Sequence, residues 1–221
     1  MTTQSIIPAS LRVELLSDAT FSRGEGTAGL VDIEVEHDSL GLPLIGGRTI
    51  RGLLRDSWLS MQPHFPDLND AAARVLGRSK SLDDECRLRV GDAYLPEPIR
   101  EAVRISLQRS VSPLGPEAIL DAFTDIRYQT AEDRSCGAPE ITTLRSTRVV
   151  LRGFRFKVAL TWLDGYQPNS DDLQVLALCA LVTRHGGLTR NRGRGHLRCT
   201  LDGDLALTRR LAEGDSKRRA S

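Results

Sequence analysis

The sequence predicts a ferredoxin-like α+β fold, in which helices cover one face of an antiparallel sheet. Alternating apolar residues, typical of strands, occur near both ends and in the middle of the chain. Apolar residues three and four positions apart, typical of helices, lie between them. The predicted order of strand, helix, strand, insertion, strand, helix, strand is that of the ferredoxin-like plan.

The first half of the chain contains three strand patterns and three helix patterns. The patterns predict a strand at 11–16, a strand with one solvated face at 30–38, helices at 50–61 and 68–76, a strand from 86 and a helix up to 107. Thr49 is in position to cap the first helix, and Gly77 to end the second. Pro96 or Pro98 opens the last helix, since proline suits the first helical turn.

The second half begins with the least regular segment, residues 110–147, for which we expect a protruding hairpin or a flexible insertion. Residues 148–163 then follow one long strand pattern. Asp171 or Asp172 is in position to cap a buried helix at 173–183. A glycine loop and a final strand complete the plan.

We expect one domain over residues 1–212, followed by a disordered tail at 213–221. The longest apolar run, residues 175–182, is far shorter than a membrane helix requires, and the N-terminus shows no signal-peptide pattern. The four cysteines lie far apart with no C-x-x-C pair, which argues against structural zinc. These observations predict a cytoplasmic protein with reduced thiols and no membrane partner.

The formal net charge is only +1, from 30 basic and 29 acidic residues, which excludes a globally basic nucleic-acid clamp. Only three of the basic residues are lysines, so arginine dominates. Either a codon preference for arginine or a need for forked phosphate donors would explain the excess. Position favours the second reason, because no acidic residue lies between Asp172 and Asp202, where five arginines occur.

That acid-free segment contains the glycine loop "RNRGRG", in which Arg190, Arg192 and Arg194 accompany Gly193 and Gly195. Glycine permits close approach of a partner and exposes successive backbone N–H groups, while arginine donates forked hydrogen bonds to phosphates. A tight turn with solvated arginines is the alternative. We predict that the loop binds a phosphate backbone.

A second acid-free segment, residues 141–163, carries four arginines and Lys157. Together with Arg48, Arg51 and Arg55 of the first helix, it is expected to form one basic surface if the fold brings these residues together. The alternative for the helix arginines is an ordinary solvated face.

Other motifs carry less information. Gly24, Gly26 and Gly29 match G-x-G-x-x-G, but an acidic, strand-like segment follows instead of a helix, so a Rossmann site is not expected. A P-loop pattern is absent from the sequence. His185 and His196 flank the arginine-rich loop, either as phosphate contacts, as an acid–base pair or as polar loop residues.

Four segments point to one family when taken in order. They are "LLSDATFSRGEGTAGLVD", "GLPLIGGRTIRGLLRD", "RLRVGDAYLP" and "GGLTRNRGRGHL", spread over residues 15–197. The chain resembles the RAMP superfamily of CRISPR-associated proteins, in particular the backbone subunits of type III effector complexes. The first segment is similar to type III-D members.

This resemblance implies an RNA-recognition-type ferredoxin-like fold with residues 110–147 as a protruding thumb. It also implies a subunit that stacks along a CRISPR RNA and holds its backbone, while the guide pairs with target RNA. The expected partners are CRISPR RNA, target RNA and other effector subunits, including further copies of this chain. The expected RNA-binding residues are Arg23, Gly46, Gly47, Arg48, Thr49, Arg51, Arg55, Arg190, Arg192, Gly193, Arg194 and Gly195.

In cleaving members of the family, an aspartate in the first loop supports metal-dependent cutting of target RNA. Glu25 stands nearest to that position here, and its longer side chain changes the reach of the carboxylate; Asp18 is the second candidate catalytic residue. Three functions remain open. They are a backbone subunit that cleaves with Mg²⁺ or another divalent ion, a purely structural subunit, and a stand-alone CRISPR RNA processing endoribonuclease using His185 or His196.

Overall fold

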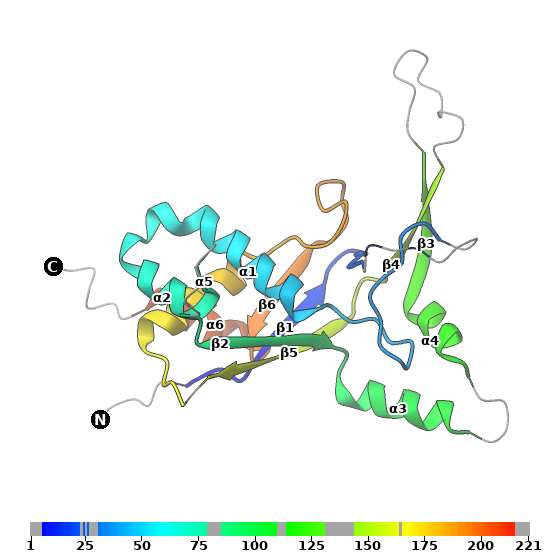
Figure 1. Cartoon of the computed structure of the whole chain (residues 1–221), viewed down its shortest axis with the longest axis horizontal. Helices are drawn as coiled ribbons and strands as arrows, with labels where there is room; N and C mark the ends of the chain where they lie inside the picture. Colours follow the sequence, from blue (N-terminus) through cyan, green and yellow to red (C-terminus); the bar gives the residue numbers. More distant parts are fainter. Residues whose placement is uncertain are drawn as a thin grey trace, which may run out of the picture.

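The computed structural model of the chain describes residues 6–22, 24, 26, 31–78, 85–109, 114–130, 144–163 and 165–214. Figure 1 shows a central sheet with helices packed against it and a long hairpin that projects from one end. Among the described residues, no helix combines the length and the apolar character needed to cross a bilayer.

The central sheet has four strands, β1 (Ser10–Leu15), β2 (Leu88–Tyr94), β5 (Arg155–Trp162) and β6 (Leu197–Leu201). Their order is β2-β5-β1-β6, and every neighbouring pair is antiparallel. This is the strand order of the ferredoxin-like fold, which confirms the predicted fold class.

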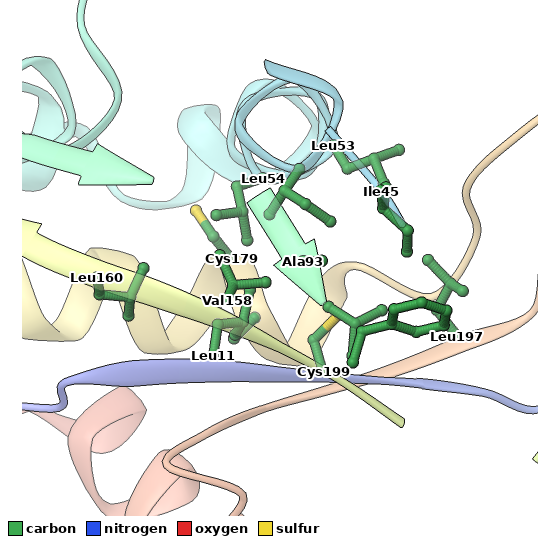
Figure 2. Packing of buried hydrophobic residues seen from close by; sticks show 14 of the residues in the cluster. Leu11, Ile45, Leu53, Leu54, Ala93, Val158, Leu160, Cys179, Leu197 and Cys199 are labelled. Carbon is green, nitrogen blue, oxygen red and sulfur yellow. The ribbon is translucent and has the colours of Figure 1, made fainter. Parts of the chain in front are cut away.

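One face of the sheet is covered by α1 (Gly47–Met61), α2 (Asn69–Leu76) and α5 (Ser170–Val182). Alternation along the strands turns Leu11, Val158 and Cys199 toward this face, where they meet Leu54 of α1 and Cys179 of α5 (Figure 2). All of them are buried. Two short 3₁₀ turns, Gln62–His64 and Pro66–Leu68, connect α1 to α2, and α6 (Leu205–Glu213) packs on α5.

The insertion between the two halves of the fold contains α3 (Glu97–Leu107), α4 (Pro116–Phe123), β3 (Thr124–Gln129) and β4 (Arg145–Val150). The two strands pair antiparallel from Thr124↔Val150 to Gln129↔Arg145 and form the projecting hairpin of Figure 1. Residues 110–113 and 131–143 lie outside the described part of the chain. The limits of the expected thumb and of the single domain therefore stay predictions.

The strand predicted at residues 30–38 is wrong. The described part of this segment makes only isolated bridges, among them Ile33↔Thr147 beside the hairpin. Its acidic side chains do not face solvent together, because Glu34 is buried against Arg148 and Asp32 accepts hydrogen bonds from Ser146. The segment instead fastens the hairpin to the rest of the fold.

The long strand predicted at residues 148–163 is divided into β4 and β5. Arg152 and Gly153 form a turn between them, and the φ of +92° at Gly153 is a value that glycine adopts easily. One strand was expected instead of two because apolar residues alternate on both sides of the turn.

Helix ends also differ from prediction. Helix α1 begins after Gly46, so Thr49 is not its cap, and α5 is capped by Asn169, whose side chain accepts from the Asp172 amide in a capping box. Helix α6 was not predicted at all and extends to Glu213. The predicted disordered tail otherwise falls on residues 215–221, outside the described part.

Candidate nucleic-acid interface

The glycine loop before β6 and the base of the β3–β4 hairpin enclose an open groove beside the end of β1. It consists of two adjoining hollows of about 600 Å³ each, which share Ser17, Gly193 and Arg194. The other lining residues are His185, Arg190, Asn191 and His196 in one hollow, and Asp18, Arg127, Leu151 and Arg152 in the other. In Figure 1 the loop, drawn in orange, and the hairpin rise on the same side of the sheet. We call the two hollows the groove.

Four arginines line the groove, and Asp18 is the one acidic residue among the lining residues. The Asp18 carboxylate accepts a hydrogen bond from Arg127 Nη2 at 3.0 Å and another from the Arg152 backbone N–H at 3.1 Å. The bond to Asp18 raises the pKa of Arg127 above its usual value. Asp18 thus joins the end of β1 to the hairpin base, and the remaining lining arginines give the groove its positive charge.

Arg194 has an unsatisfied donor. Its side chain is half-buried, and its Nη1 is shielded from solvent without a hydrogen-bond partner among the described residues. An unpaired buried guanidinium nitrogen is costly, since charged donors lose strong hydrogen bonds to water. Arg194 also lines both hollows, so a phosphate bound there would meet its guanidinium group.

The glycines of the loop serve two different purposes. A Cβ at Gly195 would overlap the carbonyl oxygen of Gly186, and a Cβ at Gly186 would press on Leu53 and Leu197. These two glycines allow the loop to pack against the rest of the protein, and they do not serve contact with a partner. Gly193 differs, because it lines both hollows with open space around it and needs glycine only for its φ of +79°.

His185 and His196 form a bridge across the base of the loop and stack with ring centroids 5.2 Å apart. Both rings are exposed and line the groove beside Arg190, which lies 3.7 Å from Asp56 of α1. The pair can offer hydrogen bonds from ring nitrogens to a phosphate in the same hollow.

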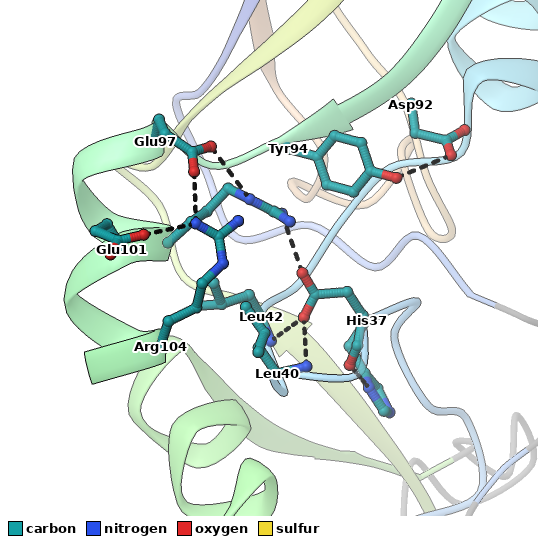
Figure 3. Close-up of polar contacts among 10 residues, drawn as sticks. His37, Leu40, Leu42, Asp92, Tyr94, Glu97, Glu101 and Arg104 are labelled. Atoms are coloured by element: carbon teal, nitrogen blue, oxygen red, sulfur yellow. Dashed lines mark hydrogen bonds and ion pairs between the residues drawn. The ribbon is translucent and has the colours of Figure 1, made fainter. Parts of the chain in front are cut away.

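The N-terminus of α1 lies apart from these hollows and is occupied by carboxylates. Glu36 accepts from the Gly46 amide at 3.2 Å, and Asp92 accepts from the Gly47 amide at 2.7 Å. Figure 3 shows Asp92 bonded also to the Tyr94 hydroxyl, next to the ion pairs that Arg104 forms with Glu97 and Glu101 within α3. The backbone N–H groups of Gly46 and Gly47 are therefore already used within the protein.

The predicted single basic surface is wrong. Arg48 and Thr49 are exposed on the first turn of α1, but Arg51 donates from Nε and Nη2 to the Leu76 carbonyl, and Arg55 lines a separate hollow between α1 and α2. Residues of the 141–163 segment diverge as well. Arg148 is buried, Arg152 enters the groove, and Arg155 and Lys157 point to the uncovered face of the sheet, because β4 and β5 are separate strands with alternating side chains.

A family model of the RAMP superfamily matches residues 12–198, most of the chain. The chain belongs to the RAMP superfamily. A search of curated proteins gave no match.

Two solved structures are similar to this RAMP-superfamily chain. A chain in the apo state of a type III-B Cmr-β structure, determined by cryo-EM, has a TM-score of 0.65 and 13% identity, covering 91% of this chain and 99% of that one. A chain of type III-B Cmr-β bound to cognate target RNA has a TM-score of 0.61 and 13% identity, with coverage of 95% and 100%. At this identity the likeness concerns the fold.

The predicted metal chemistry receives no support from the described part of the RAMP chain. No group of three or more His, Cys, Asp or Glu residues there is arranged to hold a metal ion. Each carboxylate oxygen of Asp18 accepts one hydrogen bond, and the catalytic role of Asp18 stays a prediction. Glu25 and Arg23 lie outside the described residues, and their roles stay predictions.

Four lining residues were not predicted as site residues from the sequence: Ser17, Arg127, Leu151 and Asn191. Arg127 lies in the segment with the least regular pattern, and Ser17 is an ordinary loop residue after β1. Their place in the groove follows from the hairpin docking beside β1, through the Asp18–Arg127 ion pair, which no local pattern reveals.

Proposed function

We propose that this RAMP-superfamily chain is an RNA-binding backbone subunit of a type III CRISPR effector complex, which holds the guide RNA by its phosphates. The observation that best supports this proposal is the charge of the groove. Its lining side chains include four arginines and two histidines against one carboxylate, and Arg194 has a buried donor that lacks an acceptor. A groove of this charge favours a polyanion.

The chemistry of the groove favours phosphate contacts over base recognition. Arginine donors and an open glycine position suit a backbone, which contains the same phosphate at every nucleotide. The groove lining includes no Phe, Tyr or Trp on which bases would stack. Holding RNA without reading it leaves sequence recognition to base pairing between guide and target.

The similar structures support the same assignment. They belong to a type III-B Cmr complex, one of them bound to cognate target RNA, and each matches nearly the whole of the RAMP chain. The proposed partners are CRISPR RNA, target RNA and other effector subunits, with the cytoplasm as the compartment. Cleavage of target RNA through Glu25 and a divalent ion stays a prediction from the resemblance.

Filter binding tests the proposal with two variants of equal charge. Arg190→Ala/Arg194→Ala removes two groove arginines, whereas Arg209→Ala/Arg210→Ala removes two exposed arginines of α6, at the opposite end of β6 from the loop. For single strands, each lost phosphate contact lowers the salt slope of the affinity by about 0.7. We expect the groove variant to lose roughly tenfold in affinity for CRISPR RNA at physiological salt, by the same relation.

The α6 variant should bind nearly as well as the wild type. Equal losses in both variants would mean that the groove has no special role and that only total charge matters. An unchanged affinity and salt slope in the groove variant would reject the proposed function.

The histidine pair supports one alternative, a stand-alone processing endoribonuclease. His185 and His196 lie side by side in the groove, where they could exchange protons with a phosphodiester. The test is incubation of the isolated chain with CRISPR repeat RNA in the presence of EDTA. Cleavage that is lost in His185→Ala or His196→Ala would establish this alternative, whereas intact RNA would exclude it.

A further inference from the structure

The face of the sheet opposite the helices carries a second group of basic side chains. We define the outer-face patch as Arg12, Glu14, Arg155, Lys157 and Arg198, which come from β1, β5 and β6. Register places them together, since Arg12 pairs with Lys157 and Glu14 pairs with both Arg155 and Arg198. Four are basic and one is acidic, so the patch has a formal charge of +3 in a chain of +1.

Two cations of the patch lie directly opposite each other. Arg12 and Lys157 are exposed on neighbouring antiparallel strands, an arrangement that repels and costs stability. Lys157 has no ion-pair partner among the described residues. Arg12 donates to the Gly203 carbonyl at 3.3 Å and lies against Gly203, where a Cβ would collide with its guanidinium. The two charges therefore stay close together and accessible.

The other two cations share a single carboxylate. Arg155 Nε lies 3.3 Å from Glu14 Oε1, and Arg198 Nη1 lies 3.6 Å from Glu14 Oε2. Both arginine side chains remain more than half exposed, at 60% and 57%. One negative charge cannot neutralise two guanidinium groups, so donors are left facing solvent.

The patch lies close to the groove in sequence on three strands. Glu14 of β1 lies three residues before Ser17, Arg155 at the start of β5 lies three residues after Arg152, and Arg198 of β6 follows His196 by two. Ser17, Arg152 and His196 lie just outside the strands and line the groove.

The character of the outer face favours phosphates over a protein partner. None of the large hydrophobic side chains exposed in the described part belongs to the four strands of this sheet. Stable protein interfaces have an apolar centre depleted in charge, whereas contacts to a nucleic-acid backbone need mainly cations. A depression of about 370 Å³ is lined by three of these cations, Arg12, Arg155 and Lys157, and also by the carboxylates of Glu97 and Asp202. Asp202 is already engaged by Ser10, and Glu97 by Arg104, so the cations outnumber the carboxylates there.

We propose that the outer-face patch is a second binding surface for RNA phosphates, over which a strand leaving the groove continues across the sheet. This inference takes its ligand class from the proposed function, but it concerns different residues. Lys157 should contact a phosphate directly, and Glu14 should weaken binding by competing for Arg155 and Arg198.

Lysine labelling tests the proposal directly, because the chain has only two other lysines, Lys80 and Lys217, as internal references. The full chain is treated with an amine-acetylating reagent with and without poly(U), and each lysine is quantified by mass spectrometry. We expect RNA to protect Lys157 severalfold in the wild type. Equal labelling of Lys157 with and without RNA would overturn the proposal, even if the groove variant Arg190→Ala/Arg194→Ala has lost affinity and the proposed function stands.

Two charge variants give an independent measurement. Lys157→Ala should lower the poly(U) affinity about fourfold at physiological salt and reduce the salt slope by about 0.7. Glu14→Gln should raise both, which a folding defect could not do. If Glu14→Gln binds no better than the wild type, the proposal fails.

The outcomes of the two hypotheses can be separated. Protection of Lys157 together with an unaffected groove variant would reject the proposed groove function while keeping the outer-face site. Protection of Lys157 in an effector complex stripped of RNA would identify the outer face as a subunit interface and overturn the inference.

Discussion

Gly193 and Gly195 lie two residues apart in one loop, and they tolerate a side chain very differently. Both have positive φ, +79° and +69°. A Cβ at Gly195 would also overlap the Gly186 carbonyl oxygen, whereas nothing lies within reach of a Cβ at Gly193. The same residue type thus closes the loop at one position and leaves the groove open at the other.

These contacts predict unequal effects of alanine. Gly193→Ala should cost about 1–2 kcal/mol, the strain of a left-handed conformation alone. Gly195→Ala should cost more, because backbone atoms must also move. Urea denaturation of the two variants measures the difference, and a Gly195→Ala variant as stable as Gly193→Ala would contradict the described packing.

The buried cysteines predict a second residue-level outcome. Burial raises the pKa of the Cys179 thiol and of the Cys199 thiol to about 12 each. A raised thiol pKa keeps the sulfur protonated at neutral pH, and the neutral thiol is a poor nucleophile. Iodoacetamide at neutral pH should therefore modify these two cysteines only after urea unfolding, as peptide mass spectrometry can show. Fast modification in native buffer would show that they are accessible.

At the scale of elements, the β3–β4 hairpin is attached through a buried charge network. Arg148 of β4 is 4% exposed and lies 2.9 Å from Glu34 and 2.7 Å from Asp121 of α4, with Thr124 also in reach. Ser146 and Asp32 add a second tie between the same segments. Hairpin, preceding helix and the 31–38 segment therefore form one unit.

Removal of Arg148 should loosen this unit. Arg148→Met removes the buried cation that pairs with Glu34, and breaking a buried ion pair typically costs about 3–5 kcal/mol. Adding Glu34→Gln should restore part of that loss, since the double variant no longer buries the carboxylate of that pair. Urea denaturation gives the energies, and amide exchange in β4 shows where protection is lost. Independent, additive losses for the two substitutions would mean that the residues are not coupled.

Elements with a simple hydrophobic period could be predicted from sequence, and those defined by tertiary contacts could not. Strands β1 and β5 alternate over one buried face, and α1 and α2 repeat their apolar residues at helical spacing. The 31–38 segment also alternates, but it is not a strand, because Glu34 is buried against Arg148 and the exposed Asp32 is bonded to Ser146 of the hairpin. A sequence pattern shows which residues are polar, but it does not show which residue each of them pairs with in the fold.

At the scale of the whole molecule, the net charge of +1 conceals two separate basic regions. The sequence predicts that the 141–163 segment forms one surface with the α1 arginines, but in the structure Arg152 lies in the groove, Arg155 and Lys157 lie on the outer face, and Arg148 is buried. Loop arginines Arg190 and Arg194 could be recognised from sequence, because glycines and arginines alternate there. Arg127 could not, since only the docking of the hairpin brings it to Asp18.

The most direct test for RNA phosphates in the groove is a cryo-EM structure of the native effector complex with its RNA. We expect phosphate oxygens within about 3 Å of the guanidinium groups of Arg194 and Arg152, which line the groove. RNA bound elsewhere on the subunit, with both arginines still facing solvent or protein, would contradict this expectation.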